Sequence, residues 1–286
     1  MEQTAIDQLC EALASSELEG PVASLDDSLQ EVGARKLAMS LVGKVLTNKL
    51  VNREAFRLII PRIWRTTQPV EVESLGENIF AFYFKNKLNR KRVLMGGPWS
   101  FDRSLLVIEE PKGNGDISRM RFEKSEFWIK IHNVPLLCMT RDIGLFLGKQ
   151  IGVVRKLDLG ASGDCVGRYI RVRVVVDVLR PLRRCIKVDI DASGKPMIML
   201  LRYERMPEYC FHCGLLGHSV RDCPIVETDN VEESQNYDYG SWLRATSPVR
   251  FSRQSRESEA QGGVPLSPKS SNKCENFPSP PREVRV

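Results

Sequence analysis

The sequence predicts an α+β protein with two small mixed domains, a short cysteine- and histidine-containing segment and a polar tail. Apolar residues recur at helical spacing in some segments and alternate with polar residues in others, so both helices and half-buried strands are expected. A polar linker at residues 111–118 interrupts this pattern, and the chain beyond residue 224 becomes rich in Ser, Pro, Arg and Glu. The length of 286 residues agrees with about two domains plus terminal extensions.

Residues 1–40 are predicted to form an acidic leader with a short helix from about Ala5 to Leu18. Residues 41–110 predict the first domain. Its expected elements are a strand at 41–46, a helix from the N-cap Asn52 to Trp64, strands at 69–74 and 78–85, a helix at 86–95 and a strand at 103–109. The order β-α-β-β-α-β is that of a ferredoxin-like sandwich, as in RNA-recognition motifs.

Residues 119–205 predict a second small α+β unit. Its expected elements are a strand at 127–133, a helix at 140–150 and strands at 153–158, 169–178, 184–190 and 197–203. We expect the last strands to form an antiparallel meander that leads directly into the segment at 206–225. Residues 226–286 are predicted to be a disordered tail, because their composition offers little apolar surface to bury.

A candidate metal site lies in the segment at 206–225. The spacing C-x2-C-x4-H-x4-C is formed by Cys210, Cys213, His218 and Cys223. Zinc takes four tetrahedral ligands from thiolate sulfur and imidazole nitrogen, at about 2.0–2.3 Å. Gly214 and Gly217 stand where the chain must turn tightly, and glycine tolerates the positive φ that such turns need. The spacing therefore predicts a closed structural zinc site, in which metal binding and local folding are one event.

The positive charge of the chain is concentrated in its central part. The net charge is +6, but residues 1–40 carry 8 acidic and 2 basic side chains. Residues 41–224 carry 32 basic and 19 acidic side chains, a net of +13, and residues 225–286 are near neutral. A basic folded body suits a polyanionic partner, although charge alone leaves an ordinary solvated surface equally open.

Cysteine usage and hydropathy indicate an intracellular protein, in nucleus or cytoplasm. Of eight cysteines, three belong to the zinc motif, and the other five are scattered without a pairing pattern, as expected in a reducing compartment. The chain has no run of 18 apolar residues and does not begin like a signal peptide, so no membrane partner is expected.

The segment at 210–223 resembles the retroviral-type CCHC zinc knuckle. In that family, a residue after the first Cys and a residue after the His form a small apolar cleft. An unpaired base stacks on this cleft. Phe211 and Val220 match those positions, and Arg221 is placed to meet a phosphate. Leu215 and Leu216 depart from many retroviral knuckles, where basic or polar residues are common, and they are expected to pack the knuckle onto the preceding domain.

A wider resemblance covers roughly residues 35–245. It is to a plant family called domain of unknown function 4283, and its motifs correspond to residues 92–101, 127–135, 167–173, 203–207 and 239–245. Such proteins resemble the first open-reading-frame product of LINE-type retrotransposons, or the amino-terminal part of a fused polyprotein. The resemblance implies nucleic-acid binding, with single-stranded RNA as the expected ligand and a packaging or chaperone-like role.

Basic runs supply further candidate contacts with the nucleic acid. The first run, around the helix at 86–95, contains Lys85, Lys87, Arg90, Lys91 and Arg92. In the second unit, Arg171 and Arg173 alternate on one predicted strand face, and Arg183 and Arg184 lie in the following turn. Each run alone is more typical of a solvated surface. Together with the knuckle, they favour a groove that follows the backbone of a nucleic acid.

The sheet of the first domain is a weaker candidate. Phe80, Phe82 and Phe84 share one strand face, and burial under the helices is favoured over base stacking. The other face would carry Glu71, Glu73 and Tyr83, a poor surface for phosphate.

The sequence gives no reason to expect an enzyme. It contains no glycine-rich phosphate loop before a helix and no nucleophile–histidine pairing in a plausible context, and four protein ligands would close the zinc site. The alternative to nucleic-acid binding is a protein–protein adaptor or self-associating module, in which zinc is purely a structural staple.

Overall fold

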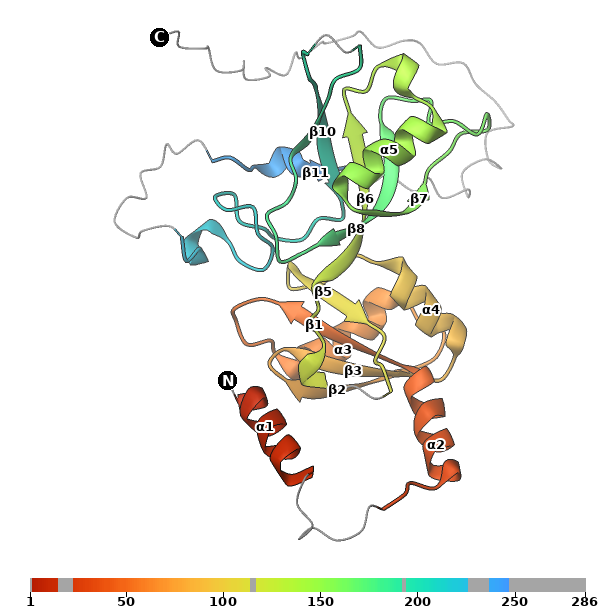
Figure 1. Ribbon diagram of the computed structural model, residues 1–286, viewed down its shortest axis with the longest axis vertical. Helices are drawn as coiled ribbons and strands as arrows, with labels where there is room; N and C mark the ends of the chain where they lie inside the picture. The colour runs from red at the N-terminus through yellow and green to blue at the C-terminus, as the bar shows by residue number, and fades with distance from the viewer. Residues whose placement is uncertain (1, 15–22, 114–116, 192–193, 226–236, 247–286) are drawn as a thin grey trace, which may run out of the picture. The chain divides into compact units, whose positions relative to one another are not determined.

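The computed structural model describes residues 2–14, 23–113, 117–191, 194–225 and 237–246 (Figure 1). Two helices occupy the predicted leader, α1 (Glu2–Ala14) and α2 (Asp27–Ala38). The first begins and ends earlier than expected, and the second was not predicted. The Asp26 side chain caps α2 by accepting a hydrogen bond from the Ser28 backbone N–H. None of the side chains of α2 is buried, so its amphipathic pattern gave little signal.

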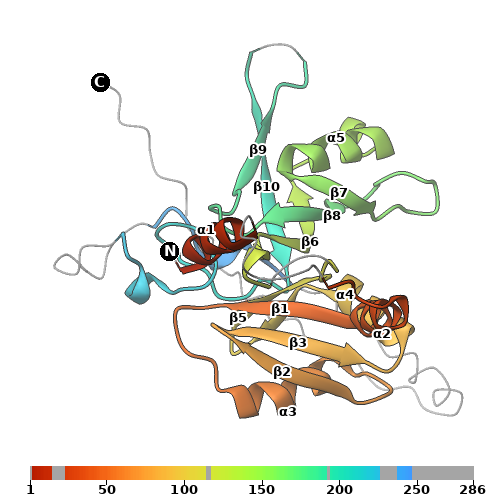
Figure 2. The same cartoon turned by 60° about the horizontal axis from the view of Figure 1, so that its bottom comes forward.

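The first domain contains the predicted order of strands and helices. Its elements are β1 (Ser40–Leu46), α3 (Arg53–Trp64), β2 (Val70–Gly76), β3 (Ile79–Phe84), α4 (Lys87–Gly96), β4 (Trp99–Phe101) and β5 (Ser104–Glu109). The sheet order is β2-β3-β1-β5-β4, and all neighbours are antiparallel. The short strand β4 was not predicted. In Figure 2, β1, β2 and β3 lie side by side with α3 on one side of the sheet.

The helices begin at polar capping residues, of which Asn52 was predicted as an N-cap. The Asn52 side chain accepts a hydrogen bond of 3.0 Å from the Ala55 N–H at the start of α3. Asn86 caps α4 in the same way. Thr140 caps α5 (Arg141–Ile151). Each cap satisfies a backbone donor that the first helical turn leaves unpaired.

The core of the first domain is aromatic and lies between the helices and the sheet. Phe80, Phe82 and Phe84 are buried, as predicted, against Phe56 and Trp64 of α3. The rings of Phe56 and Phe80 stack with centroids 3.9 Å apart. The three phenylalanines of β3 are therefore core residues and are unavailable to a ligand.

The second unit forms its own sheet, with 3-10 helices between some strands. Its strands are β6 (Lys124–His132), β7 (Val153–Leu157), β8 (Ile170–Asp177), β9 (Cys185–Val188), β10 (Met197–Glu204) and β11 (Arg244–Ala245). The 3-10 helices are η2 (Ile117–Arg119), η3 (Leu136–Cys138), η4 (Val220–Asp222) and η6 (Ser241–Leu243). The sheet order is β11-β10-β6-β8-β7, and β9 pairs with β10.

The expected meander of the last strands is present only in the antiparallel pairs β7–β8 and β9–β10. It is wrong between β8 and β9, because β6 lies between β8 and β10. The side chains of β6 agree with this inner place. Phe127, Ile129 and Ile131 are fully buried, and β6 is paired on both edges. Strand order of this kind depends on contacts distant in sequence, which local patterns do not report.

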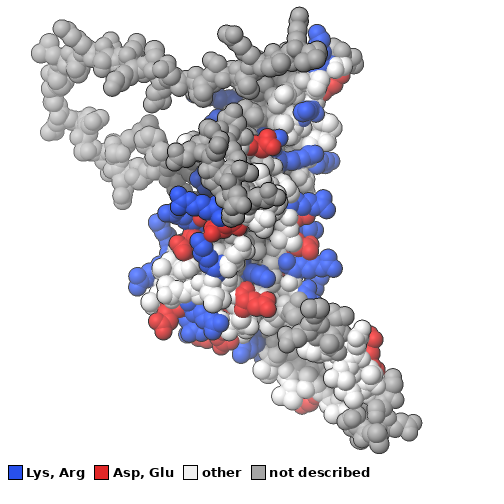
Figure 3. All heavy atoms as spheres, turned by 90° about the vertical axis from the view of Figure 1, so that its left-hand side faces the viewer, with Lys and Arg blue, Asp and Glu red and all other residues white. Residues whose placement is uncertain are grey.

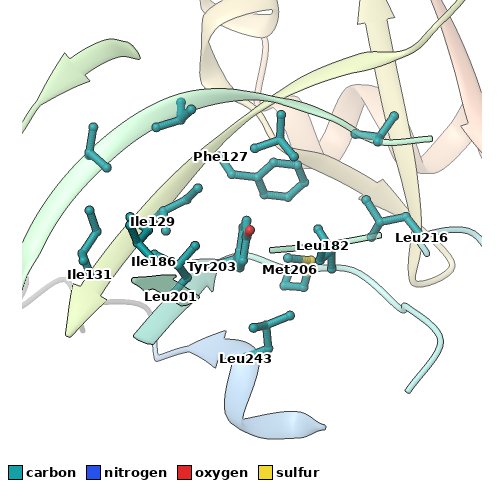
Figure 4. Packing of buried hydrophobic residues seen from close by; sticks show 14 of the residues in the cluster. Phe127, Ile129, Ile131, Leu182, Ile186, Leu201, Tyr203, Met206, Leu216 and Leu243 are labelled. Carbon is teal, nitrogen blue, oxygen red and sulfur yellow. The ribbon is translucent and has the colours of Figure 1, made fainter. Parts of the chain in front are cut away.

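A second correction concerns the predicted tail. Residues 237–246 fold back onto the second unit, where β11 pairs in parallel with β10 and the Leu243 side chain is fully buried. Figure 4 shows Leu243 beside Leu201 and Tyr203 of β10. We call residues 237–246 the clasp. The rest of the predicted tail, residues 226–236 and 247–286, lies outside the described residues.

The two sheets share part of one core. Val42 of β1 and Leu105 and Val107 of β5 belong to the same buried cluster as Phe122 and Phe127. These residues lie on the face of the first sheet opposite to its helices, since their neighbours in each strand pack under the helices. Part of that face is therefore covered by the second unit, which further reduces its value as a binding surface.

Leu243→Ala tests the clasp. We expect the substitution to lower the free energy of unfolding by about 2–5 kcal/mol, the usual cost of truncating a buried leucine. Denaturant unfolding of the full chain measures this loss. Leu50→Ala is the matched control, because the Leu50 side chain is 90% exposed and should tolerate the change. Equal stabilities of the two variants would contradict the burial of the clasp.

Candidate metal centre and nucleic-acid interface

The four predicted zinc ligands come together in the structure. The ligand atoms of Cys210, Cys213, His218 and Cys223 all lie within 4.8 Å of one another. Cys213 Sγ and His218 Nε2 are 3.3 Å apart. Cys210 and Cys223 are buried, and the other two ligands are half-buried. The predicted turns are also present, with φ of +74° at Gly214 and +97° at Gly217.

This cluster fits a tetrahedral zinc ion. Metal–ligand bonds of about 2.0–2.3 Å in tetrahedral geometry separate the ligand atoms by about 3.3–3.8 Å. Burial raises the pKa of the Cys210 thiol to about 12. Zinc binds the thiolate and displaces this proton, so occupancy must fall as the pH is lowered. The cofactor of this chain is zinc, and its four protein ligands close the site.

The loop between the ligands is shaped by backbone hydrogen bonds. The Cys210 N–H donates to the Leu215 carbonyl and the Gly214 N–H to the Cys210 carbonyl, both at 2.9 Å. The 3-10 helix η4 then leads from His218 to Cys223. The two hydrogen bonds close the turn between Cys210 and Leu215.

The knuckle is docked on both neighbouring parts of the chain. Leu216 is buried in the core of the second unit, as Figure 4 shows, whereas Leu215 is only half-buried. The Leu182 N–H donates to the Gly214 carbonyl at 3.0 Å. On the side of the first domain, Lys49 Nζ lies 3.6 Å from the Asp222 carboxylate. The expectation that the leucines pack the knuckle onto the preceding domain is therefore confirmed for Leu216.

The clasp covers the knuckle from another side. A Cβ atom on Gly214 would lie 2.2 Å from Cζ of Tyr239, so the tyrosine ring lies directly on the glycine backbone. The Tyr239 N–H donates to the Phe211 carbonyl at 3.1 Å. The Tyr209 hydroxyl donates to the Gly240 carbonyl at 2.6 Å. Sequence reasoning missed these contacts because it placed the motif at 239–245 in the tail.

Of the predicted knuckle contacts, Arg221 is exposed, and Phe211 and Val220 are half-buried. The Phe211 ring lies beside that of Tyr209, with centroids 5.2 Å apart. Tyr209 is buried, and the Phe211 ring keeps only part of its surface accessible. All three candidates lie on the knuckle, and each keeps some accessible surface.

The basic run around α4 divides into two groups. Lys85, Lys87 and Lys91 are exposed, although Lys85 Nζ lies 3.9 Å from Glu71. The side chains of Arg90 and Arg92, in contrast, already bind other groups of the protein. Arg90 donates to the Ser40 carbonyl at 2.9 Å and pairs with Glu110 at 2.8 Å. Arg92 donates to the carbonyls of Trp64 and Arg65.

Arg171 and Arg173 lie on one face of β8, as the alternation predicted, but that face is not freely solvated. Arg171 makes two hydrogen bonds of 2.8 Å to Glu204, which raise its pKa, and its guanidinium stacks 3.9 Å from the Trp128 ring centroid. Arg173 binds Glu126 at 2.7 Å and the Met95 carbonyl. The partners are distant in sequence, so the pattern of β8 alone could not reveal them.

A buried charge on the same face was not predicted. Lys130 is 5% exposed and Glu204 4% exposed, and their charged groups are 3.7 Å apart. Lys130 also donates to the Thr246 carbonyl of the clasp at 2.7 Å. Alternation along β6 would identify Lys130 as outward-facing, but it could not show that the clasp covers it.

The turn before β9 carries the last two candidates. Arg183 and Arg184 are exposed, and Arg183 donates to the Gln150 carbonyl. Arg184 NH1 donates to the carbonyl and to the carboxylate of Asp238 in the clasp, at 2.8 and 2.9 Å. Figure 3 shows lysine and arginine side chains spread over one side of the molecule with acidic side chains between them.

Two family models match parts of the chain. Residues 33–110 match a domain of unknown function, DUF4283, and residues 176–225 match a zinc knuckle. No curated protein sequence matches. The chain is similar to a solved structure of the Sex-lethal RNA recognition domains 1 and 2 from Drosophila melanogaster, with 11% identity and a TM-score of 0.20 over 48% of this chain and 85% of that chain. None of the described helices is long and apolar enough to cross a membrane.

Gly214→Ala tests the contact between clasp and knuckle. The added methyl group would displace the Tyr239 ring, and it also disfavours the positive φ. We expect zinc affinity to fall about 10- to 100-fold, although all four ligands remain. This is the usual loss when a residue that supports the metal ligands is altered. Competition with a chelator measures this loss.

The control is Gly163→Ala, where φ is +83° and the added Cβ would meet no atom within 4 Å. This variant shares the backbone strain but should keep full zinc affinity. Undiminished affinity in Gly214→Ala would show that the clasp does not support the metal site.

Proposed function

We propose that the chain is a zinc-dependent nucleic-acid-binding protein whose ligand is single-stranded RNA. The observation that carries the proposal is the knuckle, a single short segment that contains the partly accessible Phe211 and Val220 and the exposed Arg221. Stacking of one base on an aromatic ring contributes about 1–3 kcal/mol. An exposed arginine on the same knuckle supplies a donor for a phosphate of the strand.

Exposed cations around the knuckle and on α4 would follow the nucleic-acid backbone. Lys87 and Lys91 are exposed, and no described acidic side chain pairs with them. Arg90, Arg92, Arg171 and Arg173 are weaker candidates, because a phosphate would have to compete with the partners they already bind. The proposed interface is therefore smaller than the net charge of +13 for residues 41–224 suggests.

The sequence resemblances support a retrotransposon-derived protein with a packaging or chaperone-like role. Such a role needs binding without a catalytic step, which agrees with a closed zinc site. None of the seven described cysteines forms a disulfide, as expected in a reducing nucleus or cytoplasm. Localisation inside the cell is thus part of the proposal.

The second candidate function is a protein–protein adaptor or self-associating module. It is supported by the docking of Leu216, which is buried in a core cluster that contains residues of both domains. In this case, zinc would stabilise a surface for a protein partner, and Phe211 would have no role in nucleic-acid binding.

Salt dependence separates the two candidates. We expect the full chain to bind a labelled single-stranded RNA with micromolar or better affinity at low salt, and affinity to fall as salt rises. The expected log–log slope is about −0.7 for each neutralised phosphate. Fluorescence anisotropy at several salt concentrations measures it. Removing residues 247–286 should change little, and an affinity that depends on them would contradict the proposal.

Phe211→Ala should weaken RNA binding by about 1–3 kcal/mol while zinc remains bound, because no ligand is altered. Val220→Asp should act similarly by adding a repulsive charge to the apolar cleft. Phe146→Ala is the matched control, since Phe146 is 50% exposed on α5, away from the knuckle. If RNA affinity survived both knuckle substitutions, the adaptor function would be the better account.

A further inference from the structure

The clasp brings an aromatic side chain to the exposed edge of the knuckle. Tyr237 lies against His212, with ring centroids 6.4 Å apart and ring planes at 85°. His212 is exposed between two zinc ligands, and Tyr237 is half-buried. Two perpendicular rings form a corner, in which a planar group can stack on one ring while its edge approaches the other.

A cation is bound to the clasp at the residue that follows Tyr237. The Arg184 side chain is 43% exposed, and its NH1 is held by Asp238, the residue after Tyr237. Its guanidinium also lies 5.3 Å from the centroid of the Tyr239 ring. These contacts fix the side chain while Nε and NH2 remain able to donate to an anion.

Tyr237 and Tyr239 differ in what they can contribute. The Tyr239 ring is held between Gly214 and Arg184, so its role is to seat the clasp on the knuckle. Among the described residues, the ring of Tyr237 meets the exposed His212, where packing adds little to stability. An aromatic ring in such a position is well placed to stack on a ligand.

We propose that His212, Tyr237 and Arg184 form a second nucleotide subsite beside the Phe211 cleft. A base of the same single strand stacks in the corner of the two rings, and its phosphate accepts hydrogen bonds from Arg184. The inference rests on the proposed function and assigns part of the binding surface to the clasp. The subsite binds one nucleotide with any of the bases, because every base has a face that can stack on a ring.

The test is fluorescence anisotropy of the full chain with a labelled single-stranded RNA, with zinc content measured on the same samples. Tyr237→Ala should raise the Kd about 5- to 150-fold, which corresponds to the loss of one stacked base. Tyr237→Phe should keep the affinity, since stacking needs the ring and not the hydroxyl. Arg184→Gln should weaken binding and make the salt dependence less steep.

Phe211→Ala separates this inference from the proposed function. Weaker binding in both Phe211→Ala and Tyr237→Ala, with zinc retained, supports a two-part site. Weaker binding in Phe211→Ala alone overturns the second subsite and leaves the proposed function intact. If the unsubstituted chain does not bind RNA at all, both are wrong. His212→Ala with full zinc content and unchanged affinity would likewise count against the corner.

Discussion

The fold around the zinc site depends on the close approach of the clasp to the Gly214 backbone. The loop at 210–223 has no core of its own, so zinc and the backbone hydrogen bonds within the loop must close it. Its position in the molecule is then set by contacts outside the loop: the Tyr239 ring on Gly214, the Leu182 N–H on the Gly214 carbonyl and Leu216 in the core. A side chain at position 214 would remove the space that the ring occupies. The glycine thus serves both the turn and the docking.

The arginines of β8 show why net charge is a poor guide to the interface. Arg173 binds Glu126 within the second unit and the Met95 carbonyl of the first domain, so it joins the two. Arg171 joins β8 to Glu204 of β10. Burying such pairs costs desolvation, which the short hydrogen bonds offset. Acidic side chains of the protein largely neutralise the positive charge of these arginines. The arginines therefore contribute less to the attraction of a polyanion than the number of basic residues implies.

Local features of the fold were predictable from the sequence. The caps Asn52, Asn86 and Thr140 act within three residues, and the zinc ligands lie in one short segment, so their geometry follows from spacing. The central place of β6 and the docking of the clasp were not predictable in the same way. Both depend on partners far apart in sequence, and the clasp lies among residues whose composition favours disorder.

Stapling and stacking are compatible roles for one knuckle. The contacts that bury Leu216 and hold Gly214 also fix the backbone of Phe211, whose carbonyl accepts a hydrogen bond from Tyr239. A ring on a fixed backbone loses less conformational entropy when a base stacks on it than a ring on a mobile finger. Docking therefore favours binding at Phe211 as long as part of the ring remains accessible. In this fold, the contacts that dock the knuckle also position the proposed nucleic-acid site. The clasp takes part in the docking and in the proposed binding.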